Sequence, residues 1–234
     1  MGDPPTFELA PAQHEDIPRL ADIYAWALLL DPTFGFSYAS EAECKMRMIV
    51  ILEGRIGDPT WQHIKVVDKS TGMPTAWAGW NTPNDAQIRE YDESATARIR
   101  NLEEATSEDD FDSLPGAPPS IQETTDRWLA KWTVGKRYIL CKALFTDPSF
   151  QCQGMGSALI EYGNRMADQA ILPIFFQASP FEYPLYAKHG FETVEHLDVD
   201  LAKFVPGDID YDKGYGNYHL RYMVRLPRTL PEIS

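Results

Sequence analysis

The segment that most constrains this chain is Gln151 to Gly156, which reads Gln-Cys-Gln-Gly-Met-Gly. An apolar run from Tyr138 to Phe145 precedes it, and an apolar pattern with helical spacing follows it. This order predicts a strand, a phosphate-binding loop and a helix. Two glycines separated by one residue let successive backbone N–H groups converge on an anion, and the helix N-terminus adds its positive end. The segment therefore predicts a pyrophosphate site on an α/β fold.

Two common phosphate loops do not fit this segment. A dinucleotide-binding turn requires Gly or Ala three residues after the second glycine, and Leu159 occupies that position. A Walker-type loop requires Lys followed by Ser or Thr, and no such pair follows Gly156.

The remaining pattern resembles the GNAT superfamily of N-acetyltransferases in two places. Leu144 to Pro148, followed by Gln151-x-x-Gly-x-Gly, resembles the acetyl-CoA signature of that family. The strand pattern from Pro173 to Ser179, followed by Leu-Tyr and Gly-Phe within Leu185 to Phe191, resembles its second motif. The resemblance covers roughly Thr6 to Arg225. Its specific motifs lie only between Leu144 and Phe191.

The resemblance implies one GNAT domain over residues 1–234. The expected fold is α/β, with a mixed, mainly antiparallel sheet flanked by helices, whose central strands splay to admit CoA. One departure is an acidic insertion before the motif strand, at 81–127, where the family usually has a short loop. Asn81 to Arg127 holds twelve acidic and four basic side chains, more than half of the net charge of −14. Such an insertion could cover the acceptor site.

The resemblance also implies roles for individual residues. Strand backbone would hold the pantetheine, with an N–H near Phe145 or Thr146 facing the thioester oxygen, and the loop would hold the pyrophosphate. Tyr186 aligns with the tyrosine that protonates the departing CoA thiolate, with a buried core aromatic as its alternative role and Tyr183 as the fallback acid. Ser179 falls where the family commonly has Asn. The residues expected to contact acetyl-CoA are Leu144, Phe145, Thr146, Gln151, Cys152, Gln153, Gly154, Met155, Gly156, Ser157 and Ser179.

The general base is not evident from the sequence. Leu140 occupies the strand position where some family members carry Glu, which excludes direct proton abstraction from there. Asp126, Glu123, His219 and water are the remaining possibilities. His189, beside a glycine turn, is interpreted as an exposed helix end.

The implied function is acetyl-CoA-dependent N-acetylation of a small amine. Two alternatives stay open: another acyl donor or a hydroxyl acceptor, and a non-catalytic CoA-binding or interaction module. The sequence leaves the acceptor, the acyl length and the oligomeric state undetermined.

The amino-acid composition restricts the classes of partner that we expect the protein to bind. A net charge of −14 argues against a nucleic-acid partner. The charge would either attract a cationic amine or serve only solubility. Three cysteines and five scattered histidines lack metal-site spacing, so no metal is expected, and Cys152 is not expected to be a nucleophile. The chain has neither a membrane-spanning apolar stretch nor a signal-peptide pattern, so we expect a cytoplasmic protein without membrane contact.

Local patterns predict the other elements and their buried faces. Trp77 and Trp80 should lie on opposite faces of a strand, one in the core and the other facing a cleft. Leu159, Tyr162, Met166 and Ala170 should form the buried stripe of the helix after the loop. An aromatic cluster, Phe34, Phe36 and Tyr38, would serve either the core or an acceptor site. The expected elements are a strand at Thr6 to Leu9, a helix at Ile17 to Leu28, a helix at Ser40 to Ile56 with a Ser40–Glu43 capping box, a hairpin of Trp61 to Asp68 and Thr75 to Trp80, a helix at Ile121 to Trp132, and late strands at His196 to Leu201 and His219 to Arg225, joined by a loop at Pro206 to Tyr218.

Overall fold

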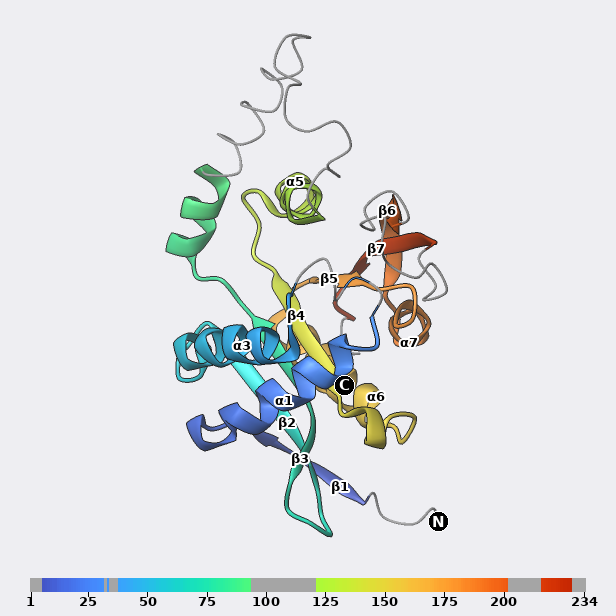
Figure 1. Cartoon of the computed structure of the whole chain (residues 1–234). Helices are drawn as coiled ribbons and strands as arrows, with labels where there is room; N and C mark the ends of the chain where they lie inside the picture. Colours follow the sequence, from blue (N-terminus) through green and yellow to red (C-terminus); the bar gives the residue numbers. More distant parts are fainter. Residues whose placement is uncertain (1–5, 32, 34–37, 94–120, 202–215, 229–234) are drawn as a thin grey trace.

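The computed structural model of the chain describes residues 6–31, 33, 38–93, 121–201 and 216–228, without the side chains of 121–126 (Figure 1). Residues 85–93 are also helical. The elements, in chain order, are β1 (Phe7–Pro11), η1 (His14–Asp16), α1 (Ile17–Leu28), α3 (Glu41–Arg55), β2 (Trp61–Asp68), β3 (Pro74–Asn81), α5 (Ile121–Thr133), β4 (Ile139–Thr146), η2 (Pro148–Phe150), α6 (Met155–Ala170), β5 (Ile174–Ala178), α7 (Tyr183–Lys188), β6 (Glu192–Asp200) and β7 (Asn217–Arg225).

The strands form one seven-stranded sheet in the order β1-β2-β3-β4-β5-β7-β6. Every neighbouring pair is antiparallel except β4 and β5, which are parallel. Helix α6 provides the crossover between these two parallel strands, as such a connection requires. The predicted mixed, mainly antiparallel sheet is confirmed.

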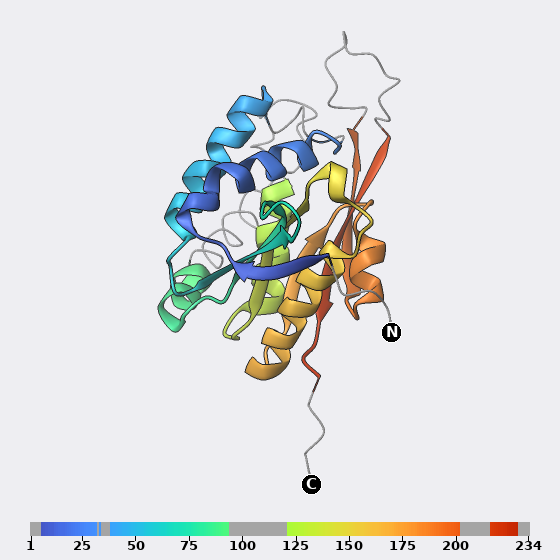
Figure 2. The same cartoon turned by 90° about the horizontal axis from the view of Figure 1, so that it is seen from below.

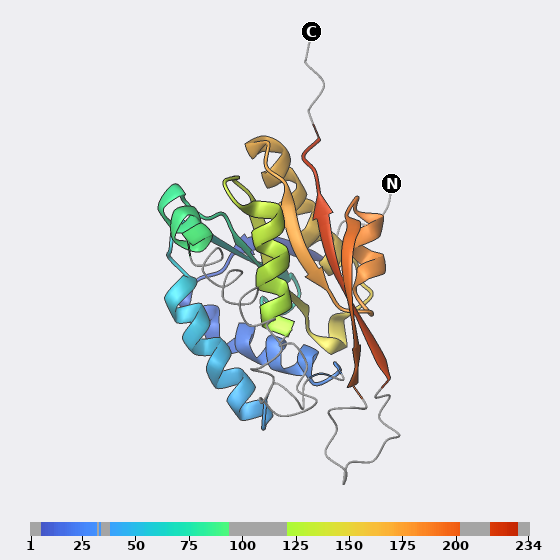
Figure 3. The ribbon, with the colours of Figure 1, turned by 90° about the horizontal axis from the view of Figure 1, so that it is seen from above.

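Helices cover both faces of this sheet (Figures 2 and 3). On β5, Ile174 and Phe176 pack into the core on the side of α6 and α7, while Phe175 between them packs against Trp128 of α5. Helices α1 and α3 lie on the α5 side, over Trp77 of β3. The alternation of side chains along each strand therefore divides the core into layers above and below the sheet.

The two tryptophans of β3 are both core residues. As predicted, they lie on opposite faces, but each is only 1% exposed, so the expectation that one faces a cleft is wrong. The indole N–H of Trp77 donates to the carbonyl of Leu20 in α1 at 2.9 Å. The Trp80 ring lies against Gly163 of α6, where a Cβ atom would overlap the ring. Helices on the two faces therefore cover both indole rings.

The buried face of α6 differs from the predicted stripe. Leu159 is buried as expected, and Tyr162 and Met166 are partly buried, but Ala170 is exposed. The helix is instead turned so that its glycine fits the Trp80 ring. Its fully buried residues are Met155, Leu159, Ile160, Gly163 and Ala167.

We expect Gly163→Ala to destabilise the protein by about 1–3 kcal/mol, because a buried indole ring cannot move aside without disturbing the sheet. Gly54→Ala in α3 is the matched control, since a Cβ there meets nothing within 4 Å. At that exposed helix position the same change should stabilise by up to about 1 kcal/mol. Urea unfolding of both variants measures the difference. Equal effects would show that Trp80 does not fix the approach of α6.

Most of the other predicted elements match within a few residues. Ser40 caps α3 by accepting a hydrogen bond from the N–H of Glu43 at 3.1 Å, but Glu43 accepts from the N–H of Ala39 rather than that of Ser40. The boundary of the expected insertion also shifts, because Asn81 pairs with Trp61 as the last residue of β3. Residues 94–120 of that segment, Phe34, Phe36 and most of the predicted Pro206 to Tyr218 loop lie outside the described residues.

Candidate active site

The central feature of the site is the divergence of β4 from β5. The two strands pair only from Ile139–Ile174 to Cys141–Phe176, although β4 continues to Thr146. On its other edge β4 stays paired with β3 to its end. The last backbone groups of β4 that point toward β5 therefore have no strand partner, so an extended ligand could bind there as an added strand.

A cavity of about 870 Å³ opens where the two strands separate. Its walls come from the C-terminal end of α1, the end of β4, the loop before α6, the start of α7 and the start of β7. Every residue expected to contact acetyl-CoA lines it except Gln153, and Tyr186 lines it as well. Its volume is within the usual range of small-molecule and cofactor sites.

The loop between β4 and α6 is anchored by a buried aspartate. Asp147 accepts a hydrogen bond from the N–H of Ser149 at 2.9 Å, and its other carboxylate oxygen accepts one from Arg19 of α1 at 2.6 Å. Further along, Cys152 has a φ of 60° and Gly154 a φ of 85°. Helix α6 starts at the next residue, and its first N–H groups lack intrahelical acceptors. The loop thus places the N-terminus of a helix, a position that favours anions, on the cavity wall.

Tyr186 is fully buried in α7, with its ring centroid 3.9 Å from that of Phe176 and edge-on to Phe191. Among the described residues its hydroxyl has no hydrogen-bond partner. Burial raises the pKa of Tyr186 well above its ordinary value, and the charges of Glu182 and Cys141 add to this. The hydroxyl therefore stays protonated at neutral pH and can donate to a ligand.

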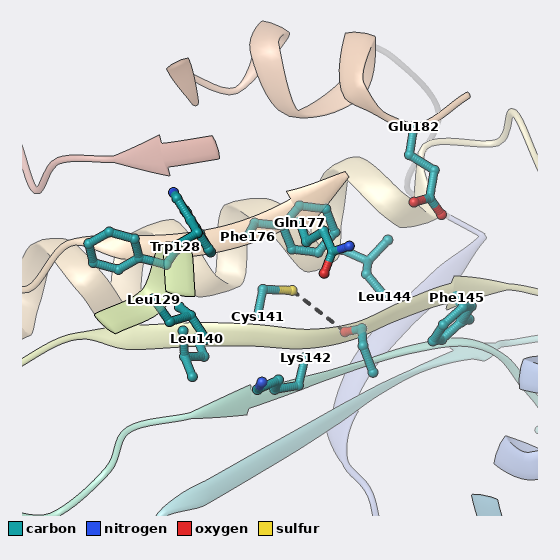
Figure 4. A pocket seen from close by; sticks show the side chains of 12 residues that line it. Trp128, Leu129, Leu140, Cys141, Lys142, Leu144, Phe145, Phe176, Gln177 and Glu182 are labelled. Carbon is teal, nitrogen blue, oxygen red and sulfur yellow. Dashed lines mark hydrogen bonds between the residues drawn. The ribbon is translucent and has the colours of Figure 1, made fainter. Parts of the chain in front are cut away.

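A smaller cavity of about 170 Å³ lies beside α5 (Figure 4). Trp128 and Leu129 line one end, and Gln177 and Glu182 lie at the other end. Because four of its residues also line the larger cavity, the two spaces adjoin where β4 and β5 separate. The shared residues are Leu144, Phe145, Gln177 and Glu182.

Residues 133–200 match the family model described as acetyltransferase (GNAT) domain. Over this segment the chain is similar to GNAT acetyltransferases. The matched segment includes β4, the glycine loop, α6, β5 and α7, which together build most of the larger cavity. No curated protein matches the chain.

Solved GNAT structures share the fold at low sequence identity. An arylalkylamine N-acetyltransferase 2 from Aedes aegypti is 12% identical, with a TM-score of 0.61 over 95% of this chain and 99% of that one. A Corynebacterium glutamicum structure, described as a histone acetyltransferase and related acetyltransferase, is 18% identical, with a TM-score of 0.59 over 97% and 99%. A Salmonella typhimurium structure solved with acetyl-CoA is 10% identical, with a TM-score of 0.55 over 98% of both chains.

Sequence reasoning missed Glu182, which lines the larger cavity together with Ser179. The hydroxyl and the backbone N–H of Ser179 lower the pKa of the Glu182 carboxyl, but burial has the larger effect and raises it. The signal was present in the spacing, since Glu182 precedes Tyr186 by four residues and such pairs lie on one face of a helix.

Among the described residues, none of those considered as a base from the sequence lines the larger cavity. His219 hydrogen-bonds the exposed Asp198 at 2.6 Å, and neither residue lines the cavity. His189 is half-buried rather than exposed, and its Nε2 lies 3.1 Å from the hydroxyl of Ser157 in the first turn of α6. The side chains of 121–126, which include the other two carboxylates considered, lie outside the described residues. Cys152 is exposed at the cavity wall.

Two kinds of feature are absent from the described residues. None of their helices combines the length and the apolar character needed to cross a membrane. Within the same part of the chain, no three His, Cys, Asp or Glu side chains are grouped so as to hold a metal ion.

Proposed function

We propose that this GNAT domain transfers the acetyl group of acetyl-CoA to the nitrogen of a small amine. The observation that carries the proposal is the unpaired end of β4, which opens into a cavity that also contains the glycine loop and the N-terminus of α6. A thioester on a long pantetheine arm ending in a pyrophosphate has the shape and charge for these two features.

For each of the following chemical requirements of acyl transfer, the cavity contains a candidate group. The backbone of 144–146 would pair with the pantetheine amides, and an N–H near Phe145 or Thr146 would stabilise the developing oxyanion. The N–H groups from Gln153 to Ser157 would bind the pyrophosphate. Tyr186 would donate a proton to the departing thiolate, since its hydroxyl is protonated and has no described partner.

An amine acceptor is supported by the charge of the cavity. Asp31 and Glu182 line it, and Lys188 is the only Lys or Arg among its described lining residues. An ammonium group would be attracted to such a surface. The names of the arylalkylamine N-acetyltransferases with this fold agree with an amine acceptor. Because acetyl-CoA is an intracellular cosubstrate, the proposal also places the protein in the cytoplasm.

The direct test is a panel of amines incubated with acetyl-CoA and the protein, with free CoA thiol as the readout. We expect amine-dependent thiol release, with the acetylated nitrogen identified by mass spectrometry. Release with hydroxyl compounds alone would support O-transfer instead. Binding of acetyl-CoA by calorimetry without turnover of any acceptor would support a non-catalytic module and contradict the proposal.

A further inference from the structure

The proposed function needs a base, because a primary alkylamine is an ammonium ion at neutral pH and its nitrogen cannot attack while protonated. Glu182 is the one Asp or Glu among the described residues that lines both cavities. It sits just before α7, where its backbone N–H donates to the carbonyl of Ser179 at 3.3 Å. Figure 4 shows its side chain extending from that loop toward the end of β4.

The position of Glu182 matches the meeting point of the two substrates in the proposed reaction. The thioester would lie along Leu144 and Phe145, which also line both cavities. An amine in the smaller cavity could lie beside Gln177 and Glu182, which line the same junction as that backbone. A carboxylate at the junction can therefore contact the amine without displacing CoA.

The surroundings of Glu182 keep it free of a cationic partner. In the described part of the chain it forms no salt bridge, and Lys142 extends away from it, on the other side of β4 (Figure 4). Burial raises the pKa of Glu182, and the nearby charge of Asp31 adds to this, while the hydrogen bonds from Ser179 oppose it. The titratable groups that interact electrostatically with it are Asp31, three residues after α1, Tyr218 of β7, Tyr186 of α7 and Cys141 of β4.

We propose that Glu182 is the general base that accepts a proton from the ammonium group of the acceptor. This inference rests on the proposed function. The neutral nitrogen then attacks the thioester carbon, the C–N bond forms and the C–S bond breaks. The nitrogen loses a second proton as the amide forms, the sulfur gains one, and one proton in total leaves to solvent.

The spacing of Glu182 and Tyr186 fits this division of roles. The carboxylate is one helical turn from the tyrosine, so a base and an acid would lie on the same face of α7, at the junction and in the larger cavity respectively. One has a carboxylate that can take a proton, and the other a hydroxyl that stays protonated.

The test uses Glu182→Gln, with Glu161→Gln on the exposed surface of α6 as the control for the lost charge. Probes are 2-phenylethylamine, spermidine and ethanolamine, which are ammonium ions at pH 7, and phenylhydrazine, whose nucleophile is already neutral. Calorimetry with acetyl-CoA and a thermal melt accompany each variant, so that a folding defect is recognised.

We expect Glu182→Gln to lower kcat/KM for the best alkylamine by about 10²-fold or more, while phenylhydrazine turnover stays near the wild-type value. A carboxylate works as a base only above its pKa. The acid limb of the wild-type pH profile should therefore lie above the ordinary glutamate range and disappear in the variant. Glu161→Gln should keep both the wild-type kcat/KM and the acid limb of the pH profile.

Three results would overturn the assignment. If the wild type acetylates none of the alkylamines, the proposed function is contradicted and the base role with it. If the wild type is active and Glu182→Gln keeps the rate and the acid limb, only the role of Glu182 is wrong. If the variant loses alkylamine and phenylhydrazine turnover equally, Glu182 shapes the site rather than accepting a proton.

Discussion

Tyr186→Phe is expected to reduce turnover about 100-fold or more, without weakening acetyl-CoA binding and without destabilising the fold. The ring keeps its contacts with Phe176 and Phe191, so packing is unchanged. The hydroxyl has no described protein partner, and removing an unsatisfied buried hydroxyl relieves a desolvation cost of about 1–3 kcal/mol. Stability should therefore hold or rise while catalysis falls.

Steady-state kinetics, calorimetry with acetyl-CoA and urea unfolding together separate the alternatives for Tyr186. Tyr183→Phe is the control, because Tyr183 lies in the same helix but its ring stacks on the guanidinium of Arg221 at 3.8 Å instead. We expect a small effect from that change. Wild-type turnover by Tyr186→Phe across the pH range would leave Tyr186 as a core aromatic and would make Tyr183 or water the proton donor.

The sheet and its helices could be predicted because their signals are local. The strand-forming runs of β2 and β3 and the helical spacing in α1 can each be recognised within a short stretch of sequence. The cap at Ser40 also depends only on neighbours in the sequence. Tertiary packing leaves these local elements as the sequence predicts them.

The rotation of α6 could not be predicted because it depends on a residue far along the chain. Four apolar positions suggested a stripe ending at Ala170, but Trp80 of β3 occupies the space above the helix. Only Gly163 fits under that ring, which turns the apolar face toward Ile160 and Ala167. A single large side chain on the sheet thus decides which side of the helix is buried.

The candidate base was missed for a related reason. Glu182 lies outside the motifs, and a glutamate in an acidic chain carries little information by itself. Its significance comes from the position where β4 leaves β5, which only the three-dimensional arrangement shows. The glycine loop, in contrast, could be found from the sequence because the φ of 85° at Gly154 favours glycine, which leaves a recognisable pattern.

Gly154→Leu is expected to weaken acetyl-CoA binding by about 10-fold or more, which corresponds to about 1.4 kcal/mol. Gly154 lines the larger cavity, and a Cβ there would meet no protein atom within 4 Å. A leucine side chain would therefore extend from the loop surface and keep a pyrophosphate away from the first N–H groups of α6. Calorimetry with acetyl-CoA measures the loss directly.

Backbone strain must be separated from this effect, because Gly154 has a φ of 85°, where a side chain costs about 1–2 kcal/mol. Gly72 in the turn between β2 and β3 is the matched control: its φ is 71°, and a Cβ there also meets nothing within 4 Å. Gly72→Leu should lower the unfolding free energy by a similar amount but leave acetyl-CoA affinity unchanged, since the turn lies outside the cavity lining. If both variants bind acetyl-CoA as the wild type does, the pyrophosphate does not lie over Gly154, and the phosphate role of the loop is wrong even if the protein proves to be an acetyltransferase.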